Sequence, residues 1–346
     1  MNLARLFARA EAAWNVAFVA HLAPGFVLAS AVLVPFAHPL VALVGGLCGA
    51  LVMGLCGRVP GPLVGAVVLP GMLVALVCAS LGILVAPLPL LAALVIALIV
   101  IASSLAAGAS PLGAGLGLIA TFAFAFSTSV RVLGGDPTGE VAQQLLVVVV
   151  GCAIGAVAGV VVGLVRARGR FVRPPKPEVS LGQGVMRSIR ERDEHLHDGI
   201  RRALPIALAM LMFAALGGRD AYWAFLAALT ILMPTGKPPM RVMLTRVVGT
   251  VVGVIVVSIL SLFLPPLVLA VIAVCALLVG LAGQERYPVV GAALGAFGAI
   301  MLIGLPSGAV ATWAVHRMLD TLIGSALALV AWRVLWPRDR ATEPAE

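Results

Sequence analysis

The sequence is poor in charged residues: Asp, Glu, Lys and Arg together make up 11% of its 346 residues. A soluble domain carries about 25% charged residues, which help to cover its surface with polar groups. The low charge therefore argues against a cytosolic globular enzyme. Hydrophobic residues make up 62% of the chain, which excludes intrinsic disorder because disordered segments are depleted in hydrophobic residues. The class that remains is a polytopic membrane protein.

Cysteine is also scarce, and the short motifs that hold metals, nucleotides or catalytic groups are missing. Cys48, Cys56, Cys78, Cys152 and Cys275 lie in or at the ends of apolar stretches without C-x-x-C spacing, so we expect packing residues and neither disulfides nor a metal site. The chain contains no H-E-x-x-H, G-x-S-x-G or G-x-x-x-x-G-K-[ST] pattern. We therefore predict that the protein is not an enzyme, binds no cofactor or metal and does not hydrolyse ATP.

Long apolar stretches account for most of the chain. A transmembrane helix needs about 20 apolar residues, and twelve candidate stretches occur, six on each side of one polar segment. The stretches are 15–36, 39–56, 61–86, 88–107, 112–128, 143–165, 203–217, 221–233, 247–264, 266–283, 288–304 and 309–336. We predict an all-α polytopic membrane protein with about 12 transmembrane helices arranged as two related six-helix halves.

This division predicts four parts. They are an N-terminal six-helix half (1–165), a basic linker with an amphipathic helix (166–202), a C-terminal six-helix half (203–336) and a tail (337–346). Lys and Arg gather in the linker and in the loops on one side, and few fall on the other. The excess of positive charge on cytoplasmic loops therefore places both termini in the cytoplasm. Val185, Ile189, Leu196 and Ile200 recur at helical spacing among the linker charges, which predicts a helix at the cytoplasmic surface in contact with anionic lipid headgroups.

The C-terminal half contains the most informative pattern. It reads Tyr222-Trp223, an apolar run, Pro234 with Gly236, and then Arg246-x-x-Gly249-Thr250-x-x-Gly253, followed later by Arg317-x-x-Asp320-Thr321-x-x-Gly324. Over about residues 200–336 this resembles the fusaric acid resistance, or aromatic acid exporter, family of integral membrane proteins. The resemblance implies a bacterial inner-membrane protein of two related helical halves, and some members of the family export aromatic carboxylic acids.

Charged residues inside apolar stretches are the strongest candidates for a translocation site. His316, Arg317 and Asp320 begin about two turns into the last stretch, where a charge is costly unless it is paired or faces water. Arg246 begins the ninth stretch. The functional interpretation is that the two arginines contact an anionic substrate while Asp320 or His316 exchanges a proton. The alternatives are a structural Arg–Asp pair for the trio and a headgroup contact for Arg246.

The remaining candidate residues come from the same half. Tyr222 and Trp223 either belong to an interfacial aromatic belt or stack on a substrate ring. The stretch 221–233 is short for a membrane span, so Thr230 and the following Pro234 are candidates for a cavity lining. We also include Thr250 among the substrate contacts. Gly249, Gly253 and Gly324 are predicted to allow close contact between helices.

We therefore predict an inner-membrane exporter of small organic (aromatic) carboxylate anions, driven by the proton-motive force through alternating access. An anion channel and a non-transporting membrane scaffold are the alternatives. The expected partners are the anionic substrate, the lipid bilayer and a second copy of the chain, and no nucleic acid.

Overall fold

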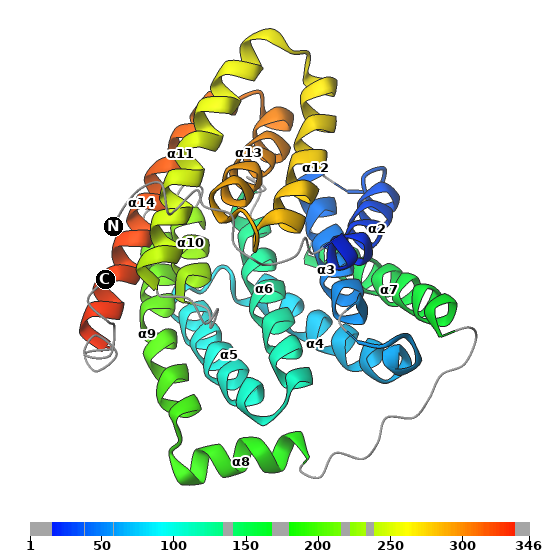
Figure 1. Cartoon of the computed structure of the whole chain (residues 1–346), viewed down its shortest axis with the longest axis vertical. Coiled ribbons are helices and arrows are strands. Elements are labelled where there is room, and N and C mark those ends of the chain that lie inside the picture. Colours follow the sequence, from blue (N-terminus) through cyan, green and yellow to red (C-terminus); the bar gives the residue numbers. More distant parts are fainter. Residues whose placement is uncertain are drawn as a thin grey trace. The chain divides into compact units, whose positions relative to one another are not determined.

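The computed structural model describes a helical protein (Figure 1). Residues 16–37, 39–57, 59–133, 141–167, 180–215, 222–232 and 239–335 are described. Within these ranges the chain forms thirteen α-helices and one short 3₁₀-helix, and no strand. Eight of the helices are long and apolar enough to cross a membrane, and two shorter apolar helices accompany them. The chain is thus a multi-pass membrane protein.

The helices follow the apolar stretches of the sequence. They are α2 (Val16–Leu33), α3 (Pro39–Gly57), η1 (Gly61–Leu63), α4 (Val64–Val85), α5 (Pro89–Ala109), α6 (Pro111–Leu133), α7 (Val141–Arg166), α8 (Leu181–Glu191), α9 (Glu194–Ala215), α10 (Tyr222–Leu232), α11 (Pro239–Phe263), α12 (Pro266–Gly283), α13 (Pro288–Ser307) and α14 (Val310–Leu335). Several begin at a proline, which suits the first helical position because its missing N–H has no partner there.

Two helices begin earlier than their apolar stretches. α9 begins at Glu194, inside the segment predicted to be linker, and α11 begins at Pro239 instead of residue 247. In both, the first turns contain arginines, which an apolar-stretch criterion assigns to a loop. Arg246 therefore does not begin its helix, as the sequence suggested, but lies two turns inside it.

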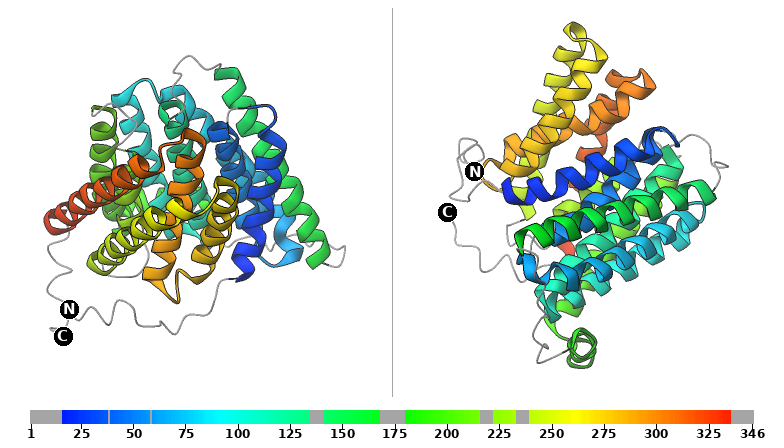
Figure 2. Two further views of the ribbon diagram at one scale, coloured as in Figure 1. Left: turned by 90° about the horizontal axis from the view of Figure 1, so that it is seen from above. Right: turned by 90° about the vertical axis from the view of Figure 1, so that its right-hand side faces the viewer.

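The chain divides into two compact units, and the boundary falls within α9, after Ala207. In the N-terminal unit, from Ala17 to Ala207, α4 and α6 pack together, α5 packs on α6, and α7 packs against both α3 and α4 (Figure 2). The contact between α3 and α7 is very close, because a Cβ atom added to Gly155 would overlap the backbone of Gly49. Small residues at such a contact let two helix backbones approach each other.

Polar contacts join the two ends of α7 to helices that come much earlier in the chain. At one end, Gln143 Nε2 of α7 donates a hydrogen bond to the Phe36 carbonyl after α2, over 3.0 Å. At the other end, Arg166 Nη1 donates to the Cys56 carbonyl near the end of α3, over 3.4 Å. Gly61, just before α4, also lies against Arg166. The helices α3 and α7 therefore run in the same direction between the two ends, and α2 runs in the opposite direction.

The C-terminal unit, from Leu208 onward, packs in the same order. Here α11 and α13 pack together, α12 packs on α13, and α14 packs against both α10 and α11. One core cluster joins Val257 of α11, Leu269 of α12, Phe297 and Met301 of α13, and Ala314 of α14. These contacts hold four helices around one apolar core.

Candidate functional site

A cavity of about 310 Å³ lies within the C-terminal unit. It is lined by Thr230 of α10, by Arg241, Val242, Thr245, Arg246 and Thr250 of α11, by Leu281 and Gln284 at the end of α12, by Pro288, Gly291, Ala292, Gly295 and Ala296 of α13, and by Arg317 of α14. Arg241 and Gln284 are exposed, so the cavity opens at the end of the unit where α11 and α13 begin and α12 ends.

One wall of the cavity is made of very small residues. Gly291, Ala292, Gly295 and Ala296 recur along α13 at helical spacing. A Cβ atom added to Gly295 would meet no atom within 4 Å. The space at Gly295 is therefore open, and the wall there is formed by backbone.

The neighbouring face of α11 is packed tightly on α13. A Cβ atom on Gly253 would lie 2.6 Å from the Ala293 carbonyl oxygen, and one on Gly249 would lie 2.9 Å from that of Val289. Because such contacts leave no room for a side chain, the two helices touch beside the cavity and stay close. The predicted packing glycine on α14, Gly324, similarly lies against Ala224 and Ala227 of α10.

Three arginines line the cavity, and they are increasingly buried from Arg241 through Arg246 to Arg317. Arg241 in the first turn of α11 is exposed, Arg246 is partly buried, and Arg317 of α14 retains 9% of its exposure. The lining that the structure describes includes no Asp or Glu. Guanidinium groups present several N–H donors in a planar fork that matches a carboxylate or phosphate. The cavity therefore has the chemistry of an anion site.

Neutral hydrogen-bonding groups complete the lining. Thr245, Thr250 and Gln284 are neutral polar residues at its surface, and Thr230 donates its hydroxyl to the Leu226 carbonyl of its own helix over 2.7 Å. Thr230 thus satisfies its donor locally and leaves oxygen lone pairs toward its surroundings. These groups add polarity to the site without adding charge.

The acidic and imidazole candidates lie beside the cavity and not in its lining. Asp320 is buried in α14, three residues after Arg317, and retains 5% of its exposure. His316 immediately precedes Arg317 and is partly buried. The Thr321 hydroxyl donates to the Arg317 carbonyl over 2.7 Å, which holds this turn of α14. Asp320, three residues after Arg317, lies on the same face of the helix, whereas His316, one residue before it, does not.

The structure thus brings together four of the residues singled out from the sequence: Thr230, Arg246, Thr250 and Arg317 all line one cavity. The side chains of Tyr222 and Trp223, and Pro234 as a whole, lie outside the described part of the chain.

Sequence reasoning missed Arg241, Thr245 and Gln284. Arg241 could have been found by extending the helix of Arg246 and Thr250 back to Pro239, where it begins. Thr245 and Gln284 carry no sequence signal of their own, because their place in the lining depends on the packing of α12 and α13 on α11.

The N-terminal unit offers a contrast. One hollow in it has a volume of about 30 Å³ and is lined by Leu22, Leu51, Leu118 and other apolar residues. A second one, lined by Val147, Val148 and Gln144 among others, has no room for a water molecule. Neither of these two hollows has an arginine in its lining.

Comparison with known proteins supports this division. Residues 207–331 match the family described as fusaric acid resistance protein-like. A search of curated proteins and a search of solved structures gave no match. The matched segment contains the whole lining of the cavity. The resemblance read from the sequence is therefore confirmed for this part of the chain: its C-terminal membrane unit is similar to the fusaric acid resistance proteins.

Proposed function

We propose that the protein is an exporter of small organic anions and that the cavity of the C-terminal unit is its substrate site. The observation that carries the proposal is the cavity itself, in which Arg241, Arg246 and Arg317 meet with no carboxylate in the described lining. The match of residues 207–331 to a transport-related family supports it.

The electrostatics favour an anion. A guanidinium within a membrane-embedded unit costs several kcal/mol unless an opposite charge or water compensates it. Asp320 lies one turn from Arg317 and offsets part of the positive charge, which leaves an excess at Arg241 and Arg246. A bound carboxylate would offset this excess and accept paired hydrogen bonds. The site therefore selects against cations and neutral solutes.

The size and shape favour a small and flat substrate. Small-molecule pockets have volumes of roughly 300–1,000 Å³, so this cavity of about 310 Å³ suits a single ring or a short chain. The wall at Gly295, where the space is open, leaves room for a ring to lie against the helix backbone. An aromatic carboxylate fits both the arginines and this wall.

A path can be traced from the exposed mouth inward. Arg241 would capture the anion, Arg246 would hold it one to two turns further along α11, and Arg317 would receive it at the buried end. Protonation of Asp320 or His316 beside Arg317 would change the affinity for the anion, so a proton gradient could drive release. Alternating access would open the buried end, with the protein lying in a bacterial inner membrane and both termini in the cytoplasm.

The packing order also supports a duplicated fold. Each unit packs its helices in the same sequence, with α3, α4, α5, α6 and α7 in the places of α10, α11, α12, α13 and α14. Gly155 of α7 lies against α3, and Gly324 of α14 lies against α10 in the same way. The residue seven positions before the glycine is Val148 in α7 and Arg317 in α14. We infer that the halves are related and that the C-terminal half carries the arginine-lined cavity.

The proposal is tested by uptake of radiolabelled benzoate-type acids into inverted vesicles, with and without a pH gradient. Arg246→Gln and Arg317→Gln should each lower the uptake rate at least tenfold. Arg333→Gln, an exposed position in the last turn of α14, is the matched control and should be neutral. Uptake that does not depend on the gradient would indicate a channel instead. No uptake of any acid would indicate a non-transporting scaffold.

A further inference from the structure

The short helix α8 and the start of α9 form a well-defined elbow. Ser180 and Gln183 form a capping box at the start of α8: the Gln183 amide donates to Ser180 Oγ over 3.2 Å, and the Ser180 amide donates to Gln183 Oε1 over 3.0 Å. Arg192, with φ of 50°, ends α8 in the left-handed conformation, and its amide donates to the Ser188 carbonyl. Both ends of α8 are therefore fixed by local hydrogen bonds.

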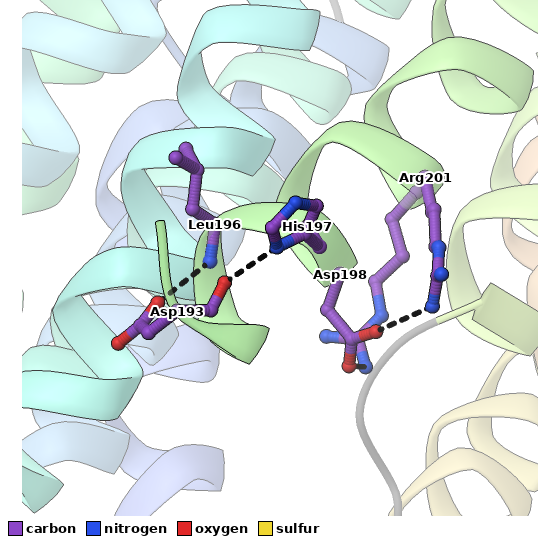
Figure 3. A network of polar contacts seen from close by, with 6 residues as sticks. Asp193, Leu196, His197, Asp198 and Arg201 are labelled. Atoms are coloured by element: carbon purple, nitrogen blue, oxygen red, sulfur yellow. Dashed lines mark hydrogen bonds and ion pairs between the residues drawn. The ribbon is translucent and has the colours of Figure 1, made fainter. Parts of the chain in front are cut away.

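The next helix is fixed in the same way. The Leu196 amide donates to Asp193 Oδ1 over 3.1 Å, so Asp193 caps α9 (Figure 3). Asp198 forms ion pairs with Arg201 and Arg202 on the following turn. Gly199 of α9 lies against Ile101 and Ser104 of α5. The elbow is therefore attached to the N-terminal unit and holds α8 in a defined orientation.

One side of α8 packs on the protein. Gly184 lies against Ala109 at the end of α5, and the Leu181 side chain lies against Gly113 at the start of α6. Ser188, one turn after Gly184, is buried on the same side. α8 therefore sits on the short turn between α5 and α6, which are both candidate membrane spans. If α5 and α6 each cross the membrane, the turn that joins them lies at a membrane surface.

A second side of α8 is apolar and exposed. Met186 keeps 51% of its exposure and Ile189 keeps 44%, and Val185 lies beside them. At 3.6 residues per turn these three side chains fall within an arc of about 100°. None of the described helices covers this arc. An apolar strip of this kind is unfavourable in water.

The third side of α8 is polar and basic. Arg187 and Arg190 lie on it, and Arg187 pairs with Glu191 over 2.9 Å. Arg190 adjoins Met186 on the boundary between the polar and apolar sides, where a long side chain can extend to a phosphate. From position 166 to position 202 the chain has ten Lys and Arg residues but only five Asp and Glu residues. The sequence segment that contains α8 therefore has a net positive charge.

We propose that α8 is an interfacial helix that binds the anionic leaflet of the membrane at the α5–α6 end of the N-terminal unit. Met186 and Ile189 enter the boundary between headgroups and acyl chains, and Arg190 binds lipid phosphate. Three sides facing protein, lipid and water are the arrangement that a helix lying in the membrane plane requires. The proposal does not depend on which solute the protein transports.

The test uses spin labels on single cysteines in full-length protein reconstituted into vesicles. The background is Cys275→Ser, which removes the exposed cysteine of the described residues. Labels at positions 186 and 189 should be more accessible to oxygen than to a water-soluble nickel chelate, and a label at position 187 should show the reverse. The 187 site is a matched control because it lies on the same helix and faces water.

Lipid composition separates the two parts of the proposal. In vesicles with 30% phosphatidylglycerol, the labels at 186 and 189 should lie deeper than in pure phosphatidylcholine, and Arg190→Gln should remove this difference. Equal depth in both lipids would overturn the binding of anionic headgroups. Labels at 186 and 189 that are accessible to the nickel chelate, or shielded from both reagents as under a protein partner, would overturn the interfacial placement.

Discussion

A single glycine in the cavity wall offers a residue-scale test of the site. Gly295 lines the cavity, and a Cβ atom there would meet nothing within 4 Å. A side chain at this position would therefore fill the cavity without disturbing the contact between α11 and α13. Gly249 and Gly253 differ, because a Cβ atom on either would meet the backbone of α13. Glycines on neighbouring helices thus serve two purposes, space for a ligand and contact between helices.

We predict that Gly295→Leu lowers the transport rate at least tenfold while the thermal midpoint of unfolding stays the same or rises. Leucine fills the space that the substrate would occupy, and it has a higher helix propensity than glycine. Transport into inverted vesicles and thermal unfolding in detergent measure the two effects. Val290→Leu, on the exposed side of α13, is the control. A Gly295→Leu variant with full activity would contradict the assignment of the cavity as the substrate site.

At the scale of elements, the contact between α3 and α7 depends on glycines in both helices. Gly45 and Gly49 of α3 lie directly against Gly151 and Gly155 of α7. In a membrane the association of helices depends on such close packing, because lipid gives no hydrophobic driving force between them. The glycines spaced by four along α7 therefore determine where α3 can lie.

We predict that Gly155→Val destabilises the protein by about 1–3 kcal/mol, the usual cost of overpacking. The valine would meet the backbone of Gly49, which cannot move aside without displacing α3. Denaturation in detergent, followed by circular dichroism, measures the loss. Ala153→Val places the same side chain on the exposed face of α7 and should be nearly neutral. Equal effects of the two substitutions would show that the contact is not tight.

The elbow between α8 and α9 gives an element-scale prediction on pH. Hydrogen bonds from the Ser188 side chain and from the Leu196 amide hold the pKa of Asp193 below its ordinary value of 3.8. Because the folded pKa is depressed, the cap stabilises the elbow fully above about pH 4, and the stabilisation is lost as the pH falls through the folded pKa.

Hydrogen exchange of the first turn of α9, corrected for intrinsic rates, should therefore show protection that decreases from pH 5 to pH 3. Asp193→Asn should remove most of this pH dependence, since asparagine caps a helix without ionising. An unchanged pH dependence in the asparagine variant would assign the effect to another group.

At the scale of the whole molecule, the alternation of helices makes a prediction on topology. The six-span interpretation places the turn at Ser110, the helix α8 and the linker on the cytoplasmic side, and the turn at Phe36 on the other. The hydrogen bond between Gln143 and Phe36 and the contact of α8 with the α5–α6 turn agree with such an alternation. The orientation as a whole follows from the distribution of arginine and lysine.

Single cysteines at positions 36, 110 and 190, again in the Cys275→Ser background, should report this orientation to a membrane-impermeant maleimide. Intact cells should label position 36 alone, and inverted vesicles should label positions 110 and 190. Labelling of position 190 from outside would reverse the proposed orientation. Labelling of positions 36 and 110 from the same side would instead contradict the six-span arrangement of the N-terminal unit.

The sequence alone determined the membrane class, the place of most helices and the resemblance of the C-terminal half, because hydropathy and short motifs are local properties. It also singled out Arg246 and Arg317, since a charged residue within an apolar stretch is costly in a membrane unless it is paired or faces water. It placed the start of α11 too late, because arginines in the first turns were counted as loop. For that reason Arg241 was missed.

The tertiary structure decided that Thr230, Arg241, Arg246 and Arg317, which come from three helices, share one cavity. It also showed that Gly295 of α13 leaves open space while the glycines of α11 and α7 bring helices together. No local pattern contains this information, since the role of a glycine depends on which helix lies opposite. The spacing of residues along a helix sets the face they share, whereas the packing of that face against its neighbours decides whether it encloses a cavity or a contact.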